Sequence, residues 1–132
     1  NNEFVLQIEH KGKVIARWDR APHHDCYHMH LYSKTGEESL KKYKEVTTLE
    51  QMVNCSINEA KSIKTILKEA GYFELLNLIP TNYEETLMKI RHKVLKKLSK
   101  PALGIRHHEV SINGAARLGA SEKNKTVKRK NL

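Results

Sequence analysis

The sequence predicts an α+β fold in which a small antiparallel β-sheet of three to four strands is followed by helices and a basic C-terminal tail. Two observations support this class. Apolar and polar residues alternate through much of 1–46, which is typical of strands with one buried face. Over 47–100 the apolar residues recur at helical spacing instead. Because the chain has 132 residues, we expect one domain over 1–100 and a basic extension over 101–132.

The strands follow from the alternation and from the turn residues between its segments. Phe4, Leu6 and Ile8 share one face of the first strand. A Gly-containing loop separates that strand from the second, and a Pro-containing loop precedes the third. Residues 38–46 fit either a fourth strand or a helical turn. The three predicted strands are 3–9, 14–18 and 28–32.

Helix starts are indicated by capping boxes, in which a Ser or Thr precedes a Glu or Gln by three residues. Thr47–Gln51 offers such a box in two registers. Ser56 and Glu59 form another, and the apolar pattern that follows ends at Gly71, a favourable C-cap residue. A third helix is expected from residue 81, with a buried stripe formed by Tyr83, Leu87, Ile90, Val94 and Leu98.

Positive charge is concentrated in the second half of the chain. Residues 1–66 carry ten Lys or Arg against nine Asp or Glu, whereas residues 86–132 carry thirteen against two. A basic segment of this kind indicates an anionic partner such as RNA, an acidic protein or a membrane surface, although a solubilising tail has the same composition. The candidate nucleic-acid-binding residues are Lys89, Arg91, Lys93, Lys96, Lys97, Lys100, Arg106, Arg117, Lys128, Arg129 and Lys130.

Most of the candidate chemistry lies between residues 17 and 30. If 28–32 is a strand, His28 and His30 project from the same face. Imidazoles can act as general acid and base near neutral pH, or they can bind zinc. They could equally be ordinary polar residues on a solvent-exposed sheet face. The candidate catalytic residues are Arg17, Asp19, His23, His24, His28 and His30. No cofactor is required by this reading, but zinc could be bound by His23, His24, Cys26, His28 and His30.

This region resembles the TumE-type toxin family of prokaryotic toxin–antitoxin pairs. The resemblance covers residues 3–55 and includes the stretch 15–24, the His-rich strand and the segment 48–53. Arg20 stands where the family usually has Asn, and the loop between His24 and His28 is short. Family positions are matched by Arg17, Trp18, Asp19, Ala21, His23, His24, His28 and His30.

The resemblance implies a small growth-inhibiting toxin that is neutralised by an antitoxin protein. We expect it to act on RNA through the His-rich site, with a ribonuclease-like activity. The alternative is a non-enzymatic nucleic-acid or ribonucleoprotein binding protein that uses its basic C-terminal half, and a metal-stabilised adaptor is a third reading. The two cysteines and the lack of a long apolar run favour a cytoplasmic protein with no membrane segment, and self-association is left open.

Overall fold

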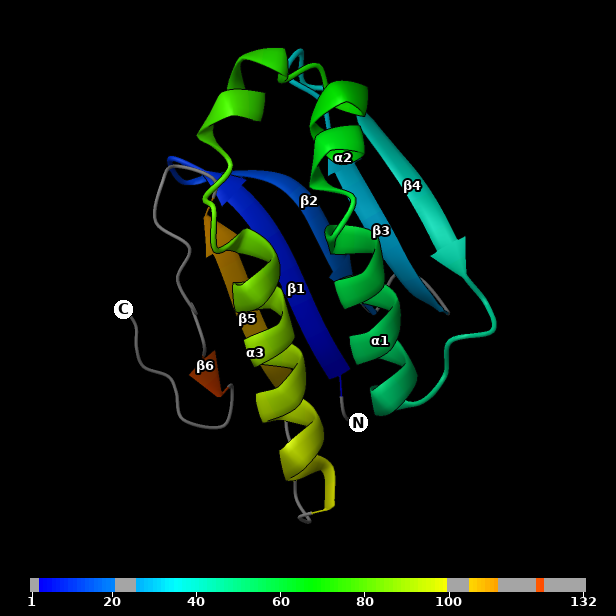
Figure 1. The fold of residues 1–132 in the computed structure, drawn as a ribbon. Helices are drawn as coiled ribbons and strands as arrows, with labels where there is room; N and C mark the ends of the chain where they lie inside the picture. Colours follow the sequence, from blue (N-terminus) through cyan, green and yellow to red (C-terminus); the bar gives the residue numbers. More distant parts are fainter. Residues whose placement is uncertain (1–2, 21–25, 100–104, 112–120, 123–132) are drawn as a thin grey trace.

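The structure is a computed structural model that describes residues 3–20, 26–99, 105–111 and 121–122. A mixed six-stranded sheet, in the order β4–β3–β2–β1–β5–β6, carries the helices on one face (Figure 1). The elements in chain order are β1 (Glu3–His10), β2 (Lys13–Asp19), β3 (Tyr27–Tyr32), β4 (Glu38–Tyr43), α1 (Leu49–Ala60), α2 (Ile63–Glu69), η1 (Phe73–Leu78), α3 (Tyr83–Lys96), η2 (Lys97–Ser99), β5 (Ile105–Ser111) and β6 (Ser121–Glu122).

The predicted α+β class is confirmed. Strands β1 to β4 pair in sequence order and are all antiparallel. The segment 38–46, for which the sequence allows a strand or a helical turn, begins with the strand β4. This strand places Glu38 opposite Tyr32 and Tyr43 opposite Tyr27. β4 lies at one edge of the sheet, and most of its side chains are exposed.

A two-residue turn sets the register between β1 and β2. Lys11 and Gly12 both have positive φ angles, 51° and 79°. This is the backbone of a type I′ turn, whose twist matches that of the strands, and Gly adopts it without steric cost. The Gly12 amide also donates a hydrogen bond of 2.6 Å to the Glu9 carboxylate. The turn pairs His10 with Lys13, and a one-residue shift of register between Ile8 and Glu9 then pairs Gln7 with Arg17.

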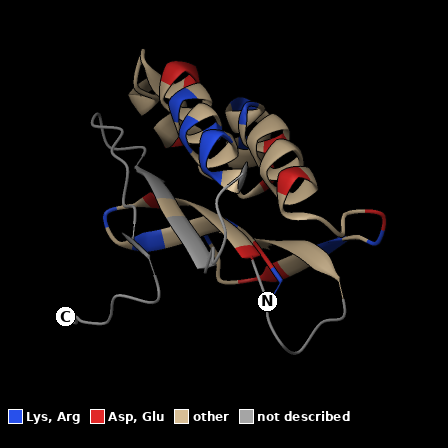
Figure 2. Cartoon of the chain, turned by 90° about the horizontal axis from the view of Figure 1, so that it is seen from below, with Lys and Arg blue, Asp and Glu red and all other residues tan. Residues whose placement is uncertain are grey.

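Alternation along the strands separates a helix-covered face from an open face. The helix-covered face includes Leu6, Trp18 and Met29, which are neighbours across β1, β2 and β3. All three are buried in one apolar core with residues of the helices, such as Ile57 and Ile90. No helix of the described residues covers the opposite face (Figure 2). The polar residues at alternate strand positions therefore project to the open face.

The helical half confirms one predicted cap and corrects another. Thr48 caps α1, and its capping box with Gln51 is complete. Ser56, however, does not begin a helix: it is buried within α1, and its hydroxyl donates to the Met52 carbonyl at 2.8 Å. A Ser followed by Glu three residues later also occurs inside helices, where the hydroxyl bonds back to the preceding turn. The buried stripe predicted for α3 is present, with Leu98 half-buried.

The strand β5 comes from the segment 101–132 that we expect to be a basic extension. It runs parallel to β1, from Glu3 opposite Ile105 to Glu9 opposite Ser111. The sequence of β5 has no apolar alternation from which the strand could be predicted. The strand forms by pairing with main-chain groups of β1, about a hundred residues earlier in the chain. The remaining part of this segment lies outside the described residues, apart from β6.

Candidate functional site

Asp19, His28 and His30 lie together on the open face of the sheet. Asp19 is the last residue of β2, and the antiparallel register places it directly opposite His28. His30 follows two positions further along β3, so it projects from the same face. One carboxylate oxygen and one ring nitrogen from each histidine lie within 4.8 Å of one another. We call these three residues the Asp–His cluster.

His28 is held in one orientation by contacts at both ring nitrogens. Its side chain is fully buried. Nδ1 lies 2.9 Å from the main-chain carbonyl oxygen of Cys26, and because a carbonyl only accepts hydrogen bonds, Nδ1 must carry a proton. Nε2 then points to Asp19, 2.8 Å from its Oδ1 atom. The main chain just before β3 thus fixes the tautomer of His28.

His30 is the more accessible histidine, with 13% of its side chain exposed. Its Nδ1 atom is hydrogen-bonded to the Glu38 carboxylate of β4. Its Nε2 atom lies 3.8 Å from Oδ1 of Asp19. The ring meets that of His28 edge to face, at 4.7 Å between centroids, and stacks on Tyr32 at 5.8 Å. Neighbours on β3 and β4 therefore orient this ring.

Arg17 contacts the Asp–His cluster and is partly exposed to solvent. Its Nε atom donates to Oδ2 of Asp19 at 2.6 Å, and its Nη1 atom donates to the Gln7 side-chain oxygen at 2.9 Å. One third of the Arg17 side chain is exposed, whereas Asp19 is almost fully buried. The guanidinium therefore compensates the Asp19 charge and also presents positive charge on the open face. An anionic substrate approaching this face would meet Arg17 and His30.

The structure brings together four of the six candidate catalytic residues: Arg17, Asp19, His28 and His30. His23 and His24 lie outside the described residues. Cys26, predicted as a zinc ligand, contributes its main-chain carbonyl to His28. Among the described residues, the side chains placed to bind a metal ion are Asp19, His28 and His30, so Asp19 takes the place of the Cys26 thiol.

Three further residues contact the cluster or the adjoining Arg17 and are absent from the candidate set. Gln7 contacts Arg17, Tyr32 stacks on His30, and Glu38 binds Nδ1 of His30. Tyr32 could have been found from alternation, since it lies two residues after His30. Gln7 and Glu38 require the pairing of β1 with β2 and of β3 with β4, which sequence periodicity does not specify.

The helix α3 lies on one side of the sheet (Figure 2), whereas alternation along β2 and β3 places the Asp–His cluster on the open face. Lys93 and Lys96 are exposed, and Lys97, the first residue of η2, is half-buried. The Nε atom of Arg91 donates a 2.8 Å hydrogen bond to Asn54 of α1, so one of its hydrogen-bond donors is used within the fold. Lys89 is exposed and lies near a Glu one turn earlier in the helix. The described part of the structure does not include Lys100, Arg117, Lys128, Arg129, Lys130 or the side chain of Arg106.

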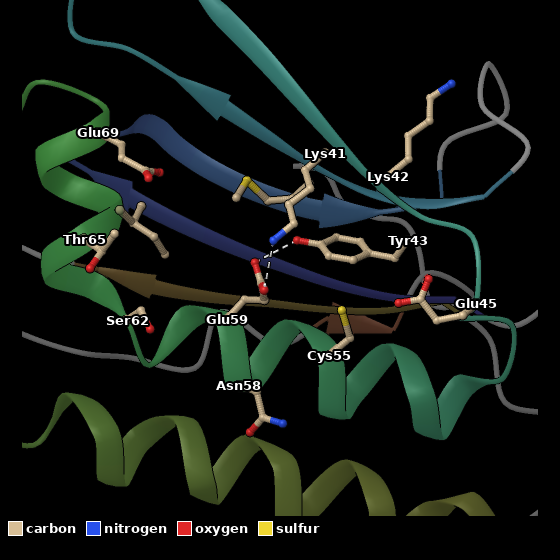
Figure 3. A pocket seen from close by; sticks show the side chains of 12 residues that line it. Lys41, Lys42, Tyr43, Glu45, Cys55, Asn58, Glu59, Ser62, Thr65 and Glu69 are labelled. Atoms are coloured by element: carbon tan, nitrogen blue, oxygen red, sulfur yellow. Dashed lines mark hydrogen bonds and ion pairs between the residues drawn. The ribbon is translucent and has the colours of Figure 1, made fainter.

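A separate cavity of about 740 Å³ lies between β4 and the helices α1 and α2 (Figure 3). Glu59 of α1 crosses it and accepts a 2.8 Å hydrogen bond from the Tyr43 hydroxyl. Lys41 lies 3.3 Å from the same carboxylate. Cys55 lines the wall of the cavity. Burial, together with the nearby carboxylates of Glu59 and Glu45, raises the pKa of the Cys55 thiol from 9.0 to about 11.

We predict that Cys55 reacts slowly with alkylating reagents in the folded protein. A thiol with a pKa of about 11 holds ~100-fold less thiolate at neutral pH than one with a pKa of 9.0, and the thiolate is the reactive form. Alkylation should accelerate as the pH rises toward 11 and on unfolding in urea. Peptide mass spectrometry after timed treatment with iodoacetamide measures this. Equal rates in folded and unfolded protein would contradict the prediction.

No protein-family model, curated protein or solved structure matches this chain. Fold and site therefore define it as an α+β protein that carries an Asp–His cluster, with an adjoining arginine, on the open face of its sheet. Among the described residues, no helix is long and apolar enough to cross a membrane.

Proposed function

We propose that this protein is a small toxin of a toxin–antitoxin pair that acts on RNA at the Asp–His cluster. The observation that supports this proposal is the placement of Arg17 and His30, both partly exposed, beside the buried Asp19–His28 pair. The resemblance of residues 3–55 to TumE-type toxins supports the toxin role. An antitoxin protein is the partner that this role requires.

The cluster has the groups needed to cleave an RNA phosphodiester. The ribose 2′-oxygen would attack the adjacent phosphorus and give up its proton to a base at the cluster. The bond from phosphorus to the 5′-oxygen would break as that oxygen takes up the proton that the base has removed, which leaves a 2′,3′-cyclic phosphate and a free 5′-hydroxyl. Arg17 would stabilise the additional charge on the phosphoryl oxygens, and a guanidinium suits this role because it remains charged and donates several hydrogen bonds.

A regulated expression test in bacteria examines this function. Wild type should arrest growth and fragment cellular RNA, whereas His30→Ala and Arg17→Gln should allow growth at equal soluble protein levels. Both replaced side chains are partly exposed, so these variants should disturb the fold less than a change at His28. The matched control is His92→Ala, which removes an exposed imidazole of α3 and should remain toxic.

Arrest by both cluster variants at the wild-type level would contradict a role for the cluster. The alternative function, nucleic-acid binding by the basic C-terminal half, is favoured by the exposed Lys93 and Lys96. In that case RNA binding would weaken steeply with salt, and a Lys93→Glu/Lys96→Glu variant would lose it while His30→Ala would not. Zinc binding by the His-rich segment, with His23, His24, Cys26, His28 and His30 as the candidate ligands, also remains a proposal.

A further inference from the structure

We infer that Asp19, His28 and His30 form a binding site for one divalent transition-metal ion, with zinc as the preferred ion. This inference goes beyond the proposed function, because the ion would be bound whether or not RNA is the target. It is based on the positions of the donor atoms, on the contacts that hold each ligand, and on the charge at the centre of the cluster.

The donor atoms are already close to the separations of a metal site. Oδ1 of Asp19 lies 2.8 Å from Nε2 of His28 and 3.8 Å from Nε2 of His30. All three donors fall within 4.8 Å of one another. Zinc binds nitrogen and oxygen at about 2.0–2.2 Å, so tetrahedral ligands lie ~3.3 Å apart. The distances of 2.8 Å and 3.8 Å fall on either side of this value, so small shifts of the side chains would complete the coordination.

Each of the three ligands is oriented by a contact through its other polar atom. Nδ1 of His28 donates to the Cys26 carbonyl, and Nδ1 of His30 is bonded to the Glu38 carboxylate. Oδ2 of Asp19 accepts from Arg17. Metal-binding histidines usually have such a carbonyl or carboxylate at the second nitrogen, which directs the first nitrogen to the ion. Here the outer contacts occupy Nδ1 of both histidines and Oδ2 of Asp19, which leaves Nε2, Nε2 and Oδ1 as the donor atoms that lie within 4.8 Å of one another.

The close approach of electron-rich atoms at that point also favours a cation. Because Nδ1 of His28 carries a proton, the Nε2 atom of a neutral His28 would present a lone pair to the Asp19 carboxylate at 2.8 Å. Two electron-rich atoms at this distance in a buried site repel each other. A metal ion bound to both atoms would remove the repulsion. The same ion would also be within reach of Nε2 of His30, which lies 3.8 Å from Oδ1 of Asp19.

Two imidazoles and one carboxylate form a ligand set of intermediate softness, which suits zinc better than magnesium or calcium. Three protein ligands leave a fourth position for water or substrate, as in catalytic zinc sites. Zinc lowers the pKa of water bound there, so the ion could provide the base that the proposed RNA chemistry needs.

Titration of the full chain with Co²⁺ and Zn²⁺ tests the inference. Co²⁺ should bind with one equivalent and produce visible ligand-field bands, and Zn²⁺ should displace it. His30→Ala and Asp19→Asn should each weaken binding at least ~10-fold, and Glu38→Gln should weaken it by a similar factor through the orientation of His30. His92→Ala, the control, should bind as wild type does. Circular dichroism and melting curves confirm that each variant is folded.

Two results would overturn the inference: no binding of either ion to folded wild type, or one-equivalent binding that persists in folded His30→Ala. The second result would place the ion elsewhere, for example at His23 and His24. Metal binding without growth arrest would reject the toxin and keep the metal site. Growth arrest that depends on His30 without metal binding would reject the metal site and keep the toxin.

Discussion

Replacement of Asp19 by alanine is expected to lower the free energy of unfolding of the metal-free protein by about 3–5 kcal/mol. Asp19 is 4% exposed and lies 2.6 Å from Nε of Arg17 and 2.8 Å from Nε2 of His28. Its removal leaves His28 with an uncompensated charge or a poorly solvated ring nitrogen in a fully buried position. Both states cost more than the loss of a surface ion pair would.

Urea denaturation followed by circular dichroism measures this loss as a lower midpoint with an unchanged slope. Glu38→Ala is the control, because Glu38 also contacts a cluster histidine but is about half exposed. Its effect should stay below about 1 kcal/mol. A midpoint for Asp19→Ala equal to that of Glu38→Ala would show that the buried charge pair contributes little to the fold.

The second large effect is expected for Trp18→Ala, at about 3–5 kcal/mol. Trp18 is the largest fully buried side chain and lies between Leu6 and Met29 at the centre of the helix-covered face. Truncation would leave a cavity at the contact between the sheet and its helices. Because small domains are stable by about 5–15 kcal/mol, this loss would remove much of the stability.

Thermal and urea unfolding of Trp18→Ala beside Phe73→Ala tests the prediction. Phe73 is also a large aromatic residue, but it is 60% exposed, so its truncation should change stability by no more than about 0.5 kcal/mol. Equal losses in the two variants would contradict the central position of Trp18 in the core. Trp18 and Asp19 are adjacent on β2 and project to opposite faces of the sheet. The stability losses of Trp18→Ala and Asp19→Ala therefore compare the two faces of the same strand.

Part of the candidate site could be predicted from local sequence. The separation of two residues places His28 and His30 on one face of any strand, so their common orientation follows from backbone geometry alone. Asp19 was a candidate through its position in the motif, but its contact with His28 depends on the register of β2 with β3. Glu38 became a neighbour of His30 only because the ambiguous segment 38–46 begins with an edge strand.

Local sequence also predicts only part of the helical half. The stripe from Tyr83 to Val94 was predictable because burial repeats at the period of the helix. Ser56 was misleading, because a Ser with Glu three residues later fits both a helix start and a helix interior. Which of the two applies depends on whether the preceding residues are already helical, and here α1 begins at Leu49.

The sequence by itself determined the α+β class, the first four strands up to the ambiguity of the last, the basic face of α3 and the common face of the two histidines. These features depend on periodicities of two and 3.6 residues, which are local properties of the chain. Only the tertiary structure decided that Asp19 joins the histidines, that β5 lies parallel to β1, and that α3 and the Asp–His cluster lie on opposite sides of the sheet. Strand pairing and layer packing decide these points, because they depend on contacts between residues far apart in the chain.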